Sequence, residues 1–74
     1  MNSVEPAPPI LILLWRKTAE SWGIYGRRFE LLAQESEHTF HPEEGLRFRY
    51  QAANAYDHQR RALERAAALE RWEL

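Results

Sequence analysis

The chain contains no cysteine among its 74 residues. Disulfides, thiol catalysis, iron–sulfur clusters and cysteine-ligated zinc sites are therefore excluded. Charge of one sign is not in excess either, since ten Lys and Arg residues balance eleven Asp and Glu residues and the net charge is −1. This balance argues against a histone-like protein or another strong binder of polyanions.

Long hydrophobic runs are also missing. The longest, Ile10 to Trp15, has six residues and is far too short to span a bilayer. Pro8 and Pro9 precede it, and the basic stretch that opens a signal peptide does not. We therefore expect no membrane partner and a cytoplasmic location.

Glycine is scarce, with three residues, and no glycine-rich phosphate loop or nucleophile elbow is present. The sequence also lacks paired carboxylates in an apolar setting. A chain of this length offers no enclosed pocket of ordinary ligand size. We therefore expect neither enzymatic activity nor a bound cofactor.

Alanine and aromatic residues are what the chain does contain. Hydrophobic residues make up 45% of it, ten of them are alanine, and three Trp, three Tyr and three Phe add large side chains. A core built by so short a chain contributes little net stability. We therefore expect it to bury apolar surface against a partner, most simply a second copy of itself.

Residues 1–9 form a Pro-rich segment that favours an extended tail. From residue 10 to about residue 36, apolar side chains recur at alternating steps of four and three, which predicts one face of a helix. This first stripe contains Leu11, Trp15, Trp22, Tyr25, Phe29 and Leu32. Gly23 and Gly26 lie inside the pattern and allow either a break in the helix or the close approach of another backbone.

A polar segment at about residues 37–41 predicts a turn, and Pro42 fits the first position of a second helix that ends at about residue 72. The stripe on this helix contains Phe48, Ala52, Ala55, Gln59, Ala62, Ala66 and Leu69, and it is flanked by Tyr56 and Leu63. Two charge pairs at i,i+4 spacing support the helix, and they are Asp57–Arg61 and Arg60–Glu64. Residues 10–74 are thus expected to form one all-α domain, an antiparallel two-helix hairpin.

The expected turn also sets the register of the hairpin. A turn centred near residues 39 and 40 places Gly23 and Gly26 beside residues 53–56, and Trp15 beside residues 63–67. Small residues then face large ones, as in an interlocking core. Much of each stripe would still be exposed to water, so we expect a homodimer in which the two stripes build a four-helix bundle.

A polar surface is expected on the outer side of the second helix. Its side chains recur at steps of four and three, and they are Arg47, Gln51, Asn54, His58, Arg61 and Arg65. Such side chains read base edges and phosphates in nucleic-acid complexes. The same pattern is also the solvated side of an amphipathic helix, and Asp57 and Glu64 partly neutralise it. We therefore place a protein partner first on this surface and nucleic acid second.

Two smaller features complete the candidate sites. Trp72 lies next to Arg71 near the C-terminus, a composition typical of an interaction hot spot. Glu35 and His38, with His41 nearby, have a Glu-x-x-His spacing that resembles the ligand spacing of ferritin-like diiron bundles. Their expected position is the frayed end of the hairpin, so we interpret them as a polar turn and keep metal binding as a minor alternative.

These observations together predict a small non-catalytic interaction protein, such as an adaptor, regulator or inhibitor. It would act as a homodimer or as a subunit bound to another helical protein.

Overall fold

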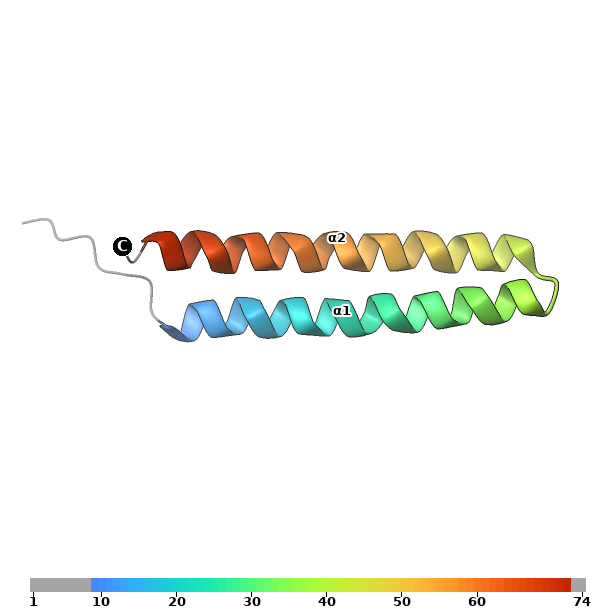
Figure 1. The fold of residues 1–74 in the computed structure, drawn as a ribbon, viewed down its shortest axis with the longest axis horizontal. Coiled ribbons are helices and arrows are strands. Elements are labelled where there is room, and N and C mark those ends of the chain that lie inside the picture. Colours follow the sequence, from blue (N-terminus) through green and yellow to red (C-terminus); the bar gives the residue numbers. More distant parts are fainter. Residues whose placement is uncertain (1–8, 73–74) are drawn as a thin grey trace, which may run out of the picture.

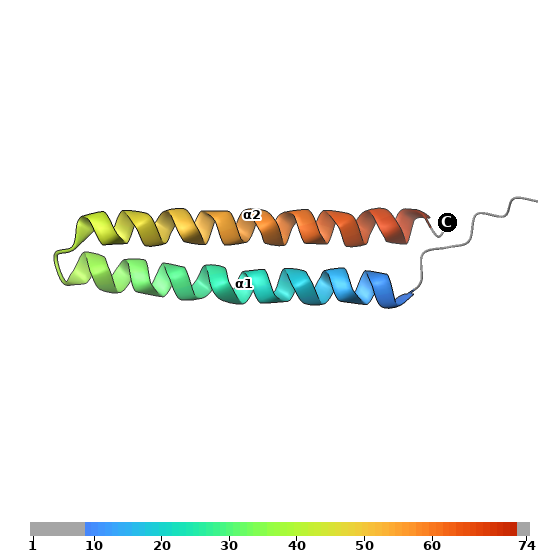
Figure 2. The same ribbon diagram turned by 180° about the vertical axis from the view of Figure 1, so that it is seen from behind.

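The computed structural model of the chain describes residues 9–72, which form two helices, α1 over Pro9–His38 and α2 over Pro42–Trp72. The helices lie side by side and antiparallel, joined by a short turn (Figure 1). The view from behind shows the same arrangement along the whole hairpin (Figure 2). The start of α1 and the end of α2 therefore lie together at an open end, and the expected all-α hairpin is confirmed.

Helix α1 is one uninterrupted helix of 30 residues. It continues through Gly23 and Gly26, so the break that these glycines allowed is absent. It begins at Pro9, which the sequence pattern had placed in the tail; the fixed φ of proline suits the first position of a helix. The rest of the expected tail lies outside the described residues, and no helix among those described is long and apolar enough to cross a bilayer.

The end of α1 has a defined capping geometry. The amide of His41 donates to the carbonyl of Ser36 at 2.8 Å, and the amide of Phe40 donates to the carbonyl of Glu37 at 3.4 Å. This pair of bonds is the Schellman motif, in which the residue that donates the inner bond adopts a left-handed conformation. Phe40 is that residue, with a φ of 62°, where glycine is usual.

Helix α2 begins directly after this motif. The amide of Gly45 donates to the carbonyl of His41 at 3.1 Å, which is the first bond of the helix. Pro42 is the first helical residue, as the sequence predicted, and Glu43 and Glu44 lie in the first turn. There the carboxylates interact favourably with the positive end of the helix dipole.

Small residues line the contact between the two helices, which we call the seam. The buried residues are Ile12, Ala19, Gly23, Gly26, Ala33 and Ser36 in α1 and Gly45, Ala52, Ala55, Ala62 and Ala66 in α2. No large side chain of the described residues is fully buried. A buried alanine methyl contributes about 0.8 kcal/mol, so the seam allows close packing but stabilises the hairpin only modestly.

The expected register agrees with the structure to within about one helical turn. The guanidinium of Arg65 lies over Trp15, as the symmetric pairing predicted. The ring of Tyr56 fills the space beside Gly26, which also agrees. Gly23 instead faces Gln59, slightly beyond the expected segment.

Candidate functional site

The seam has two flanks, because the buried positions of α1 repeat every seven residues. These positions are Ile12, Ala19, Gly26 and Ala33. Residues three places after them lie on one flank and residues four places after them lie on the other, since a helix turns by about 100° per residue. The first flank receives Trp15, Trp22, Phe29 and Ser36, and the second receives Arg16, Gly23, Glu30 and Glu37.

The second flank carries three polar links between the helices. They are Arg16–Glu70, Glu30–Tyr56 and Glu37–Arg49. Glu37 accepts two hydrogen bonds from Arg49, at 2.6 Å from Nε and 2.7 Å from Nη2. Because the linked residues are seven or fourteen places apart in each helix, they form a polar ladder along this flank.

Hydrogen bonds in the hairpin shift the pKa values of several groups. The bonds from Arg49 lower the pKa of the Glu37 carboxyl, and the bond to Glu30 raises the pKa of the Tyr56 hydroxyl. On α2, a hydrogen bond from Arg60 lowers the pKa of Asp57. These side chains are exposed or half-buried, so each link contributes little stability and serves mainly to hold the register.

The first flank pairs indole rings with cationic or imidazole side chains. The Trp22 ring stacks on the imidazole of His58, with a centroid distance of 4.4 Å and an interplanar angle of 20°. The guanidinium of Arg65 lies 5.6 Å from the centroid of the Trp15 ring, within the range of a cation–π interaction. These contacts order both Trp side chains without burying them.

Phenylalanine side chains continue the same flank toward the turn. The rings of Phe29 and Phe48 lie 6.4 Å apart at their centroids, with an interplanar angle of 25°. The flank as a whole is called the aromatic face, and its members are Trp15, Trp22, Phe29, Phe48, His58 and Arg65.

The residues expected to build the bundle core lie mostly beside the seam. Ala52 is buried within the hairpin. The half-buried members are Trp15, Trp22, Phe29, Phe48, Tyr56 and Leu69, and the exposed members are Leu11, Tyr25, Leu32 and Leu63. These large side chains therefore leave apolar surface available outside the hairpin.

The six side chains expected to form the polar surface of α2 are all exposed. They are Arg47, Gln51, Asn54, His58, Arg61 and Arg65. His58 and Arg65 contact the indole rings of α1, so the structure joins this polar surface to the aromatic stripe that the sequence treated separately. Arg61 is paired with Asp57 at 3.0 Å, as the i,i+4 spacing predicted.

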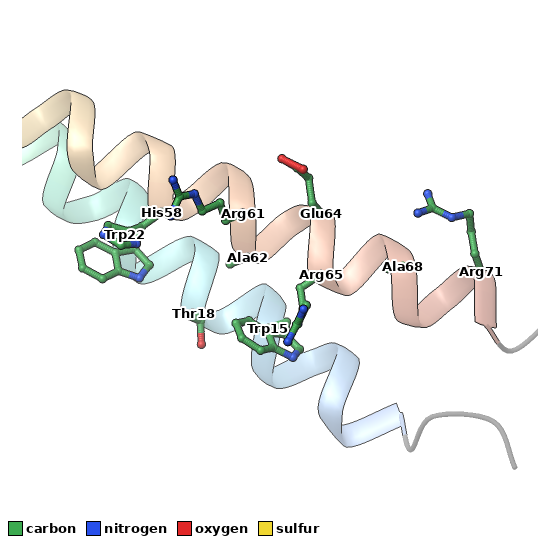
Figure 3. A pocket seen from close by; sticks show the side chains of 10 residues that line it. All are labelled: Trp15, Thr18, Trp22, His58, Arg61, Ala62, Glu64, Arg65, Ala68 and Arg71. Atoms are coloured by element: carbon green, nitrogen blue, oxygen red, sulfur yellow. The ribbon is translucent and has the colours of Figure 1, made fainter.

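A shallow groove of about 590 Å³ follows the aromatic face near the open end. Figure 3 shows the indoles of Trp15 and Trp22 projecting on the same side of α1, with Thr18 between them. Ala62 contributes a small residue from α2 to the lining. Arg61 and Arg65 extend from α2 beside the groove, and Arg71 and the carboxylate of Glu64 complete its rim. The groove is therefore apolar, with a rim that carries more positive than negative charge.

Large apolar side chains are also exposed elsewhere, mostly on α1. Those on α1 are Ile10, Leu11, Leu13, Leu14, Ile24, Tyr25, Leu31 and Leu32. Phe40 at the turn is 90% exposed, more than any other large apolar side chain among the described residues. The sequence pattern did not single out Phe40, because only its backbone conformation brings it to the tip.

Two smaller candidate sites were expected, one at the turn and one next to Arg71. Within residues 9–72, no three His, Asp or Glu side chains lie together where they could hold a metal ion, so Glu35, His38 and His41 do not form such a group. Trp72 is the last residue of α2, and its side chain lies outside the described part of the structure.

Comparisons with known proteins give no indication of function, so the function is inferred from the geometry of the hairpin. No protein-family model, no curated protein sequence and no solved structure matches the chain. The arrangement of the described residues offers apolar contact, aromatic stacking and cationic hydrogen-bond donors on one flank, and these are the elements of a binding surface.

Proposed function

We propose that the chain is a non-catalytic protein-interaction module that acts as a homodimer or as a subunit of a larger helical complex. Its contact surface is the aromatic face. The observation that carries this proposal is the distribution of side-chain size. Alanine and glycine make up most of the seam, while the large apolar side chains of the described residues other than Ile12 lie outside it.

Energetics favour a second helical surface as the partner. Complete burial of one large apolar side chain stabilises a protein by about 1.5–3 kcal/mol, more than a buried alanine contributes. Two hairpins that pack through their aromatic faces would bury several such side chains at once and form a four-helix bundle. The cytoplasmic location expected from the sequence stays a prediction.

Paired substitutions on α1 test the proposed contact surface. Tyr25 and Leu32 follow Trp22 and Phe29 by three places and border the aromatic face. We expect Tyr25→Lys with Leu32→Lys to reduce the mass in solution from about twice the 8.8 kDa of the chain to that of one chain. Light scattering on a sizing column measures this change, and circular dichroism compares the helicity of the variant with that of the unmodified chain diluted until it is monomeric.

The matched control uses two equally exposed residues on another side of the same helix. Ile24→Lys with Leu31→Lys adds the same charge one position earlier, away from the aromatic face. We expect this variant to associate like the unmodified chain. Equal loss of association in both variants would place the contact elsewhere on α1 and contradict the proposal.

Nucleic-acid binding is the second candidate, because the six polar side chains of α2 are all exposed along one side of the helix. Binding of this kind weakens steeply as salt is raised, since counterions are released from the phosphates. Substitution of Arg47, Arg61 and Arg65 by alanine should abolish it without unfolding the helices. Unchanged binding by that variant would exclude this surface.

A further inference from the structure

We propose that the tip of the hairpin docks into the groove between Trp15 and Trp22 of a second copy. Two hairpins would lie antiparallel, and each would place its Phe40 ring in the groove of the other. This inference rests on the proposed self-association and names the side chains that make the contact.

The tip presents an aromatic ring in an unusual way. Phe40 has a φ of 62°, a left-handed conformation that is uncommon for a large residue. Its side chain is 90% exposed, so nothing within the described hairpin accounts for an apolar ring at this position. Glycine or asparagine would cap the helix at lower cost, and a ring that contacts a partner gives the phenylalanine a role.

The groove has a shape and composition that suit such a ring. Trp15 and Trp22 stand two helical turns apart on α1, with Thr18 between them (Figure 3). His58 and Arg65 order the two indoles from α2. The groove is therefore preformed, and an inserted aromatic side chain would meet apolar walls on both sides.

The tip of the hairpin and the groove differ in the sign of their charge. Glu43 and Glu44 lie next to the turn, and Glu44 borders both the hollow at Phe40 and the one at Phe29 and Phe48. The groove is lined by three arginines and one carboxylate, which are Arg61, Arg65, Arg71 and Glu64, so positive charge is in excess there. An antiparallel pair would bring the carboxylates of each tip to the guanidinium groups of the other copy, which favours this orientation over a parallel one.

The spacing along α1 is consistent with two-fold symmetry. Phe29 is halfway along the sequence between Thr18 in the groove and Phe40 at the tip. If each tip lies in the opposite groove, the two-fold axis passes close to Phe29 and Phe48. An isologous contact brings the same residues of both copies together there, and these are the stacked phenylalanines of the aromatic face.

Phe40→Gly separates association from folding. Glycine adopts the left-handed conformation readily, so the hairpin should melt no lower than the unmodified chain when both are monomeric. We expect the dimer to weaken about tenfold or more, as for the loss of an aromatic anchor. Leu46→Ala, which trims another exposed side chain near the turn, should leave the dimer constant unchanged.

Charge reversal tests the orientation. One variant carries Glu43→Arg with Glu44→Arg at the tip, and the other carries Arg61→Glu with Arg65→Glu at the groove. Circular dichroism first establishes that each variant is as helical as the unmodified chain diluted until it is monomeric. We expect each to be monomeric alone and the two together to form a mixed dimer, because both tip-to-groove contacts are then between opposite charges.

The outcomes separate this inference from the proposed function. A dimer that is unaffected by Phe40→Gly overturns the tip contact while leaving self-association intact. Reversed variants that dimerise alone, or that fail to pair when mixed, overturn the antiparallel orientation. Open polymers instead of dimers would contradict the closed two-fold arrangement, and an unmodified chain that stays monomeric and fully helical would overturn the proposed function itself.

Discussion

The two buried glycines of α1, Gly23 and Gly26, differ in how much space a side chain would find beside them. A methyl group at Gly26 would lie 2.7 Å from Cε1 of Tyr56, whose hydroxyl is bonded to Glu30. A methyl group at Gly23 would meet Nε2 of Gln59, the end of a flexible side chain that can swing away. The tyrosine ring is thus the more restrictive neighbour.

We therefore predict opposite effects for two identical substitutions. Gly23→Ala should stabilise the hairpin by about 0.5–1 kcal/mol, because alanine is the better helix former. Gly26→Ala should destabilise it by about 1 kcal/mol, since overpacking against Tyr56 exceeds the same gain. Urea unfolding followed by circular dichroism measures both, and a Gly26→Ala variant more stable than Gly23→Ala would contradict the packing described here.

The residue with the most unexpected role is Phe40. Glycine after a helix is a strong signal for a left-handed cap, and the sequence has none there. The hydrogen bonds of the Schellman motif impose the conformation instead. Sequence patterns could therefore predict a turn near residues 39 and 40, but not which side chain the turn presents.

At the scale of the helices, ion pairs between and within them make stability depend on pH. Arg49 lowers the pKa of Glu37 in the folded hairpin, and Arg60 lowers that of Asp57. A carboxyl whose pKa is lowered by folding stabilises the fold above its unfolded pKa and loses that contribution as the pH falls through the folded pKa. We predict that the melting temperature decreases as the pH falls below about 4, the range in which carboxyl groups titrate.

At alkaline pH a different group, the hydroxyl of Tyr56, makes the stability of the hairpin decrease as the pH rises. The bond to Glu30 raises the pKa of Tyr56, so its contribution is present at neutral pH and is lost as the pH rises through that raised pKa. Melting curves across the pH range measure both effects. Arg49→Gln should make the melting temperature fall less between neutral and acidic pH. A melting temperature of the unmodified chain that rises as the pH falls would contradict the role of these ion pairs.

The sequence predicts the helices better than the surface between them. Pro42 marks the start of α2, and the i,i+4 pairs Asp57–Arg61 and Arg60–Glu64 form as expected. The predicted stripe of α2 contained the four alanines that are buried in the seam, which are Ala52, Ala55, Ala62 and Ala66. The α1 side of the seam was harder to predict, because large apolar residues were taken as the core. Its signal is the seven-residue repeat of small residues, such as Ala19 with Gly26, which only a close approach of two backbones requires.

The candidate site was predicted in its parts and not as a whole. Both the aromatic stripe and the polar surface of α2 were evident from spacing. Whether the stripe and the polar surface lie next to each other depends on how far each helix is rotated about its axis. A rotation by one residue moves a side chain about 100° around the helix. Pairing of Trp22 with His58 could therefore emerge only from the packed hairpin.

The hairpin exposes large apolar side chains at positions where a domain that is stable on its own would carry polar ones. Its seam of alanine and glycine aligns two helices, and the ladder holds their register on one flank. The aromatic face on the other flank stays partly open to solvent. We infer that the hairpin reaches its full stability when this face is covered.

Solution mass measured together with helicity over a concentration series tests this inference most directly. The expected result is a helical species of about twice the 8.8 kDa chain mass, with helicity that falls as dilution separates the copies. A chain that remains monomeric and equally helical at every concentration would contradict it, because the hairpin would then be stable with its aromatic face uncovered.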